Sequence, residues 1–158
     1  VIGRSLSKKL GFKFYDLDDY IEQIEGKKVS EIFKEKNEVY FRKIENKYLH
    51  ELSLKNEKKI ISTGGGTPCF KNNIKIIQTT SNSISVYLKA SIETLVKRLF
   101  HSIDKRPLIS HLEDKSELKE FITKHLFERS FYYEKSDVKI KTDDIELKDI
   151  IKLIKELI

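Results

Sequence analysis

Two acidic side chains stand where a short strand would end. Asp16 lies near the end of the aromatic-rich segment 12–17, whose composition predicts a β-strand, and Asp18 follows directly after it. In an open parallel sheet, ligands bind at the carboxyl ends of the strands. Two carboxylates one residue apart could serve a magnesium ion and a substrate hydroxyl there. A solvated turn, in which the aspartates cap the next helix, would explain the same pattern.

A run of three glycines is the second candidate. Gly64, Gly65 and Gly66 follow residues 59–62, a short segment that predicts another strand, with Thr63 between them. Because glycine has no side chain, backbone amides in such a run can approach a ligand closely. The whole sequence contains six glycines, so three in succession favour a ligand-binding loop over an ordinary tight turn.

Three arginines could hold or stabilise anionic groups. Arg42 and Glu45 lie three residues apart, so a helix would place them on one side, where Glu45 could orient Arg42 towards a carboxylate ligand. Arg106 lies in the long polar segment 102–115 and could close over a phosphoryl group during its transfer. Arg129, on the helix that follows, could be a second carboxylate anchor. Each arginine also has an ordinary surface interpretation, which for Arg42 is an exposed ion pair with Glu45.

Strands and helices alternate along the chain. Strands are predicted at 12–17, 59–62, 84–88 and 138–141, and helices at 2–10, 18–25, 29–54 (in two pieces around Asn37), 73–79, 91–100, 116–134 and 146–158. This alternation is typical of an α/β protein whose parallel sheet has helices on both faces, in three layers. No linker or repeat divides the sequence, so we expect one domain over residues 1–158, with residues 102–115 as a loop. Two helices have apolar stripes that should face the core: Phe41, Ile44, Tyr48 and Leu52, and Leu147, Ile150, Ile154 and Leu157.

The composition is that of a soluble globular protein. Of 158 residues, 39% are hydrophobic and 35% are charged, and no apolar run approaches the roughly 20 residues of a membrane-spanning helix. The formal net charge is +6, but lysines alternate with glutamates, which argues against a nucleic-acid partner and suits anionic small molecules. The single Cys69 rules out an internal disulfide and fits a reducing cytoplasm.

In their order and spacing, the motifs resemble the shikimate kinase family over essentially the whole chain. They are Ile2-Gly3-Arg4, Phe14-Tyr15-Asp16-Leu17-Asp18, Phe41-Arg42 with Glu45, Thr63-Gly64-Gly65-Gly66, Val86-Tyr87-Leu88, Arg106-Pro107-Leu108, and Glu128-Arg129 ahead of Tyr133. The resemblance implies a P-loop kinase-like fold with a five-stranded parallel sheet. It also implies an ATP- and Mg²⁺-dependent enzyme, a cytoplasmic monomer, that phosphorylates the 3-hydroxyl of shikimate in aromatic amino acid (chorismate) biosynthesis.

The resemblance gives three candidate residues roles in the chemical step. Asp16 would hold the magnesium ion. Asp18 would bind the shikimate hydroxyls and orient or deprotonate the attacking one. Arg106 would contact the nucleotide from a lid and stabilise charge on the phosphoryl group.

The other candidates would bind shikimate. Arg42 and Arg129 would hold its carboxylate. Backbone contacts would come from Gly64, Gly65 and Gly66, and the walls of the pocket would be Phe33 and Phe41.

One part of the family pattern does not occur in the printed sequence. The family has a strand and a phosphate-binding loop ending in Gly-Lys-Ser/Thr directly ahead of the Ile2-Gly3-Arg4 motif, and no Gly-Lys-Ser/Thr is present here. We therefore expect the sequence to be N-terminally truncated, without the central strand between those that begin near Lys59 and Ile84. A non-catalytic binding or regulatory module is the alternative that this leaves open. A gluconate-type kinase fits less well, because Arg42, Arg129 and the triple glycine suit a carboxylate with a diol.

Overall fold

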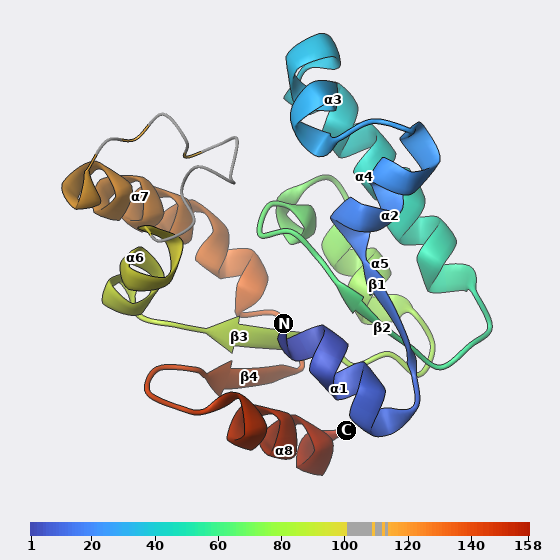
Figure 1. Cartoon of the computed structure of the whole chain (residues 1–158). Helices are drawn as coiled ribbons and strands as arrows, with labels where there is room; N and C mark the ends of the chain where they lie inside the picture. The colour runs from blue at the N-terminus through green and yellow to red at the C-terminus, as the bar shows by residue number, and fades with distance from the viewer. Residues whose placement is uncertain (101–108, 110–111, 113) are drawn as a thin grey trace. The chain divides into compact units, whose positions relative to one another are not determined.

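The computed structural model describes residues 1–100, 109, 112 and 114–158. Along the chain, the elements are α1 (Ile2–Leu10), β1 (Lys13–Asp16), α2 (Leu17–Glu25), α3 (Val29–Lys36), α4 (Glu38–Leu54), β2 (Lys59–Ser62), the 3₁₀ turn η1 (Thr67–Cys69), α5 (Asn73–Thr79), β3 (Val86–Lys89), α6 (Ile92–Phe100), α7 (Lys115–Tyr133), β4 (Val138–Lys141) and α8 (Leu147–Leu157) (Figure 1). The strands and helices predicted from the sequence are all present, with bounds that differ by one or two residues.

The strands form two parallel pairs. β1 runs beside β2 with Asp16 opposite Ser62, and β3 runs beside β4 with Val86 opposite Val138. The chain groups into two compact units: residues 1–85 with 147–158 hold the first pair, and residues 86–146 hold the second. Parallel strands joined through helices confirm the predicted α/β class. The single domain over the whole chain stays a prediction.

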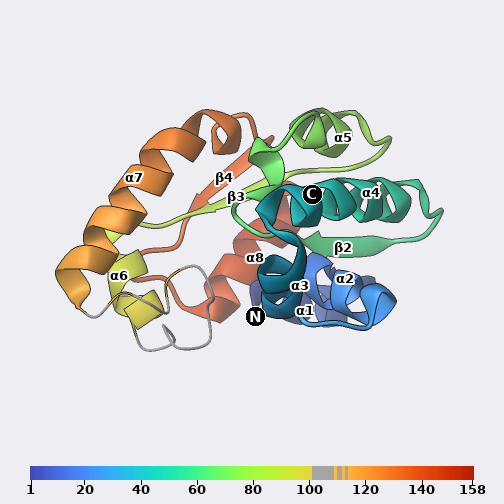
Figure 2. The ribbon, with the colours of Figure 1, turned by 90° about the horizontal axis from the view of Figure 1, so that it is seen from above.

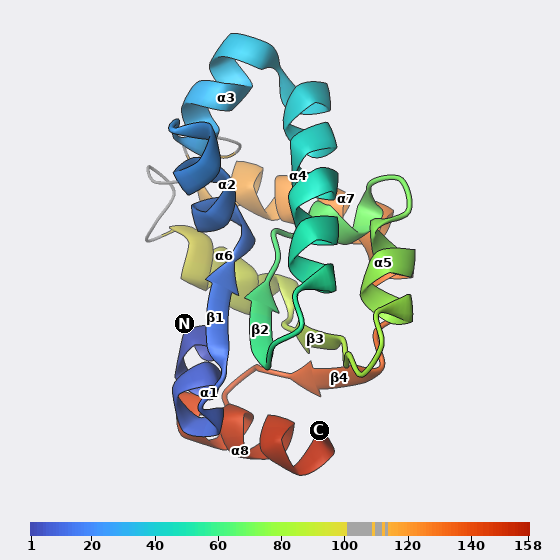
Figure 3. The same cartoon turned by 90° about the vertical axis from the view of Figure 1, so that its right-hand side faces the viewer.

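In the first unit, helices cover both faces of the β1–β2 pair (Figure 3). On one face, α1 lies so close that a methyl group on Gly3 would come within 2.8 Å of the Phe14 ring, and α8 packs beside α1. The alternate strand residues Tyr15 and Ile61 point the other way, into a core built by α2, α3 and α4. This unit therefore has the three layers that the sequence predicts.

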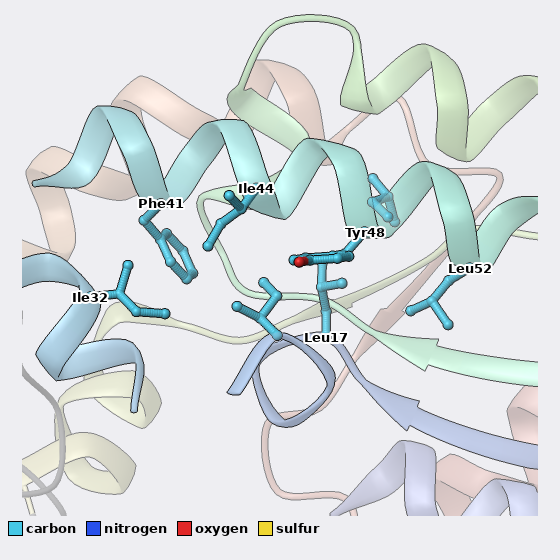
Figure 4. Packing of buried hydrophobic residues seen from close by; sticks show 8 residues of the cluster. Leu17, Ile32, Phe41, Ile44, Tyr48 and Leu52 are labelled. Atoms are coloured by element: carbon cyan, nitrogen blue, oxygen red, sulfur yellow. The ribbon is translucent and has the colours of Figure 1, made fainter. Parts of the chain in front are cut away.

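The core of the first unit is built around the apolar stripe of α4. The stripe residues Phe41, Ile44, Tyr48 and Leu52 are buried against Leu17 of α2 and Ile32 of α3, as predicted (Figure 4). Burial of one such side chain contributes about 1.5–3 kcal/mol. This packing fixes the rotation of α4 about its axis, and so determines the side on which its charged residues lie.

Asn37 separates α3 from α4, at the break that the sequence predicts. Its φ of 88° lies in the left-handed region and ends α3. Its side-chain Oδ1 accepts a hydrogen bond from the Tyr40 backbone N–H at 3.1 Å, which caps α4. The break lets α3 fold back onto α4, so that Phe33 meets Phe41.

The prediction for α8 is wrong at the two ends of the helix. Ile150 and Ile154 are buried as expected, but Leu147 is 39% exposed and Leu157 is 52% exposed. Ile151, outside the predicted stripe, is buried. The buried residues Ile150, Ile151 and Ile154 all lie in the middle turns of α8, so tertiary packing, part of it from α1, covers the middle of the helix and leaves the apolar residues at its ends exposed.

In the second unit, α6 and α7 lie side by side (Figures 1 and 2). Ile109, Leu118 and Ile122 form a buried cluster that packs against apolar residues of α6. Ser91 caps α6 as predicted, since its Oγ accepts a hydrogen bond from the Thr94 N–H at 3.1 Å. Within the described part of the chain, no helix is long and apolar enough to cross a membrane.

Candidate active site

Two loops with candidate residues leave the β1–β2 pair at the same edge. The strands are parallel and end opposite each other at Asp16 and Ser62. After Asp16 the chain turns into α2, and after Ser62 it enters the glycine run (Figure 3). The aspartates and the triple glycine therefore meet at the carboxyl edge of the strands, where parallel sheets bind ligands.

Asp16 and Asp18 lie at the N-terminus of α2. Asp16 Oδ1 accepts a hydrogen bond from the Asp18 backbone N–H at 3.2 Å, so Asp16 caps the helix. This cap holds the carboxylate at the strand end. Among the described residues, no group of three or more His, Cys, Asp or Glu side chains could hold a metal ion. A single carboxylate such as Asp16 suits Mg²⁺, which is commonly held by one or two carboxylates together with substrate phosphates and water.

Asp18 is a weaker acid than an ordinary aspartate. Burial raises its pKa from 3.8 to about 6, and the negative charges of Asp16 and Glu45 act in the same direction, whereas the positive charge of Arg42 opposes them. At neutral pH, Asp18 is therefore ionised, but it holds a proton more strongly than a solvated aspartate would. A carboxylate of this kind suits a general base.

Arg42 is buried, with 9% of its surface exposed. Its Nη1 donates to Glu45 Oε2 at 2.9 Å, and its Nε and Nη2 both donate to Glu38 Oε1 at 3.3 Å. Burial alone would lower the pKa of the guanidinium, but the charges of Glu45 and Glu38 outweigh it and raise that pKa. The surface interpretation of this ion pair is wrong, because the loop after β2 covers it.

The glycine run lies directly against the guanidinium. A methyl group on Gly66 would come within 2.8 Å of three guanidinium atoms of Arg42, so any side chain at this position would force the guanidinium to move. A methyl group on Gly64 would lie 3.8 Å from Glu45 Oε1 and 3.9 Å from Asp18 Oδ1. Gly64 and Gly66 thus sit between Asp18 of α2 and the ion pair of α4, whereas Gly65 is exposed.

Phe33 and Phe41 pack together beside Arg42. Their ring centroids lie 4.7 Å apart, and the Arg42 guanidinium carbon lies 5.4 Å from the centroid of the Phe41 ring. Phe41 is buried, and Phe33 is partly exposed. The two rings could therefore border a ligand that Arg42 holds.

Three polar residues around Arg42 were not predicted from the sequence. Glu38 is a second carboxylate on the guanidinium. The Thr67 hydroxyl donates to Glu45 Oε1 at 2.7 Å, and the Asn73 amide donates to the Thr67 carbonyl at 2.8 Å. Thr67 could have been suspected because it directly follows the glycine run, but nothing in the sequence marks Asn73.

The contacts that the structure describes around Arg42 and Asp18 do not include two of the candidate arginines, Arg106 and Arg129. Arg129 lies on α7 in the second unit and is half-buried. Arg106 lies outside the described residues. The roles expected for both stay predictions.

The chain matches a known family along its whole length. A family model described as Shikimate kinase matches residues 1–158. A shikimate kinase of Flavobacterium johnsoniae is 44% identical over 157 residues, which cover 99% of this chain and 90% of the relative. Among solved structures, the shikimate kinase of Bacteroides thetaiotaomicron is 32% identical with a TM-score of 0.90, over 99% of this chain and 89% of that one. The Acinetobacter baumannii shikimate kinase in complex with shikimate is 28% identical with a TM-score of 0.86, over 99% and 83%.

Proposed function

This chain belongs to the shikimate kinase family, and we propose that the protein transfers the γ-phosphoryl group of ATP to the 3-hydroxyl of shikimate. The observation that carries the proposal is the buried guanidinium of Arg42, held by two carboxylates beside the glycine run and close to Asp18. An anchor for a carboxylate and a base for a hydroxyl, placed in one small region, match a substrate that has both groups.

Arg42 would bind the shikimate carboxylate. A guanidinium has five N–H groups, and the bonds to Glu38 and Glu45 use one on each of its three nitrogens, which leaves one on each Nη. The Glu38 side chain is 57% exposed, so it can turn into solvent. Nε and Nη2 of Arg42, which now donate to Glu38, could then donate to the substrate carboxylate. Glu45 is fully buried and would stay in place to hold the guanidinium.

The rest of the substrate would lie along the same edge. We assign the backbone of Gly64, Gly65 and Gly66 to polar contacts with shikimate, since no side chain shields their amides. Phe33 and Phe41 would contact its ring. From the sequence resemblance alone, Arg129 is proposed as a second arginine for the carboxylate.

Asp18 would be the base. In the transfer, the hydroxyl oxygen of shikimate forms a bond to the γ-phosphorus, and the bond from that phosphorus to the bridging oxygen of ADP breaks, so ADP leaves with the electron pair. The hydroxyl proton passes to the Asp18 carboxylate. A pKa of about 6 keeps Asp18 ionised at neutral pH and raises its affinity for this proton above that of an ordinary aspartate.

ATP and magnesium complete the proposal. ATP is the phosphoryl donor of this family. Asp16, an oxygen ligand at the strand edge, would hold a Mg²⁺ ion that binds with the phosphates, and such an ion neutralises their charge. Arg106 is proposed, from the sequence, to stabilise charge on the phosphoryl group.

We propose a cytoplasmic monomer that acts in chorismate biosynthesis. The sequence has a single cysteine, Cys69, so the chain cannot form an internal disulfide, and this fits a reducing cytoplasm. A non-catalytic binding module is the weaker alternative. Such a module would need the anchor at Arg42 but no base, and the raised pKa of Asp18 favours the enzyme.

Titration calorimetry on the protein expressed from its full reading frame tests the anchor. Arg42→Ala should weaken shikimate binding about tenfold to a hundredfold, because it removes charge-assisted hydrogen bonds. The methyl ester of shikimate, which lacks the negative charge, should bind wild-type protein and variant about equally. Lys43→Ala removes an exposed cation from the next position of α4 and is the matched control. Equal loss for acid and ester, or no loss for either, would remove Arg42 from the site.

A further inference from the structure

Thr67 donates a hydrogen bond to the buried carboxylate of Glu45, on the oxygen that Arg42 does not contact. The residue is fully buried at the start of η1, one position after the glycine run. Its hydroxyl donates to Glu45 Oε1 at 2.7 Å, while Glu45 Oε2 accepts from Arg42 Nη1 at 2.9 Å. Glu45 is also fully buried, so each of its oxygens depends on one of these two donors for the hydrogen bonding that water would otherwise provide.

Thr67 is itself fixed by the surrounding backbone and side chains. Its N–H donates to the Gly64 carbonyl at 3.1 Å, and its carbonyl accepts from Asn73 Nδ2 at 2.8 Å. Asn73 Oδ1 in turn accepts from Asn46 Nδ2 at 2.5 Å, and Asn46 follows Glu45 on α4. The hydrogen bonds therefore form a closed ring. It runs from Asn46 of α4 to Asn73 of α5, then to Thr67 of η1, and back to α4 at Glu45.

This ring determines the plane of the Glu45 carboxylate. A carboxylate with a single donor can rotate about its last side-chain bond, which is a soft torsion. A second donor on the other oxygen removes that freedom. Since the buried Glu45 accepts from Arg42 Nη1 at 2.9 Å, the plane of its carboxylate sets the direction in which the guanidinium faces, and it would still do so if the exposed Glu38 turned away.

We propose that Thr67 is a positioning residue for recognition of the substrate carboxylate, acting through Glu45 on Arg42. This inference rests on the proposed function, since it concerns the orientation of Arg42, the residue proposed to bind the shikimate carboxylate. The hydroxyl does not touch substrate. It fixes the carboxylate that fixes the guanidinium, and so its loss should affect shikimate far more than ATP.

The test compares three variants in the protein expressed from its full reading frame. Thr67→Val keeps the shape and removes the hydroxyl, and Thr67→Ser keeps the hydroxyl and removes the methyl group. Thr80→Val is the control, because the Thr80 hydroxyl donates to the Ile76 carbonyl of α5 and, among the described residues, has no bond to the Arg42 site. Thr67→Val should raise the Kd and KM for shikimate about tenfold, the usual effect of one hydrogen bond to a charged group. The KM for ATP should stay within about twofold, as should every constant of the other two variants.

A double-mutant cycle separates positioning from a general structural effect. If Thr67 acts through Arg42, then Thr67→Val should cause no further loss of shikimate affinity once Arg42 is alanine. Losses that add in the double variant, or an unchanged KM for shikimate in Thr67→Val, would overturn the inference. Should Thr67→Val fail to fold, Thr67→Cys replaces it, because a thiol is a weak donor in the same position and should give a smaller loss in the same direction. Absence of shikimate binding by wild-type protein would refute the proposed function itself, before any variant is compared.

Discussion

Replacement of Asp18 by asparagine should make the protein more stable and inactive. The pKa of Asp18 is about 6 instead of 3.8, so the folded protein disfavours its charge by about 3 kcal/mol. Asparagine keeps the shape and removes the charge. Because Asp18 is partly exposed, solvent screens part of this energy, and we expect the free energy of unfolding to rise by about 1–2 kcal/mol near pH 8. For a domain of this size, that corresponds to a rise in Tm of about 3–6 °C.

The gain in stability of Asp18→Asn over wild-type protein should increase as the pH rises. Since the folded-state pKa of Asp18 is raised above its unfolded value, folded wild-type protein binds more protons between pH 3.8 and about 6. Its stability therefore falls as pH rises through that window, and the asparagine variant escapes this fall. The advantage of the variant should be absent below about pH 4, about half developed near pH 5 and constant above about pH 7.

Chemical denaturation of both proteins at several pH values measures this difference. Asp19→Asn is the matched control, because Asp19 is the next residue of α2 and is exposed. Its replacement should change stability by no more than about 0.5–1 kcal/mol and should not raise it. If Asp18→Asn were no more stable than Asp19→Asn, or if its gain did not vary with pH, burial of a charged Asp18 would not be the cause of its weak acidity.

Three further changes test the site and the core. Gly66→Ala should displace the Arg42 guanidinium, since its methyl group would come within 2.8 Å of it, and calorimetry should find shikimate binding at least about tenfold weaker, with ATP binding retained. In steady-state kinetics, kcat/KM for shikimate should fall as pH drops below about 6, because protonated Asp18 cannot accept the hydroxyl proton. Leu52→Ala, at a fully buried core position of α4, should lower the free energy of unfolding by about 2–5 kcal/mol in urea and leave both KM values unchanged at temperatures where the variant is folded.

The sequence predicted the parts of the site that depend on local pattern. Asp16 ends one strand and the triple glycine comes after another. Parallel pairing brings the ends of the two strands to one edge, so the proximity of these residues follows from the alternation of elements. The break at Asn37 and the stripe of α4 also follow from local spacing.

Other features of the site and the core depend on tertiary packing, and the sequence alone did not predict them. The spacing of Arg42 and Glu45 is the same for a surface ion pair as for a buried one. The pair is buried because the glycine run, far away in the sequence, lies against the Arg42 guanidinium. Thr67 contacts Glu45 across 22 positions of the chain, and no local pattern signals such a contact. Likewise, the residues of α8 that are buried depend on tertiary packing, including contacts with α1 at the other end of the sequence, and helical periodicity alone does not show that Leu147 is exposed.

Identification of the reaction product shows whether the protein phosphorylates the 3-hydroxyl of shikimate. The protein expressed from its full reading frame should be incubated with ATP, Mg²⁺ and shikimate, and the product analysed by phosphorus NMR. We expect ADP formation that requires shikimate, together with a new phosphate monoester whose phosphorus couples to the proton on carbon 3 of the shikimate ring. ATP consumption that does not require shikimate, a phosphate on another hydroxyl, or no product at all would contradict the proposed function.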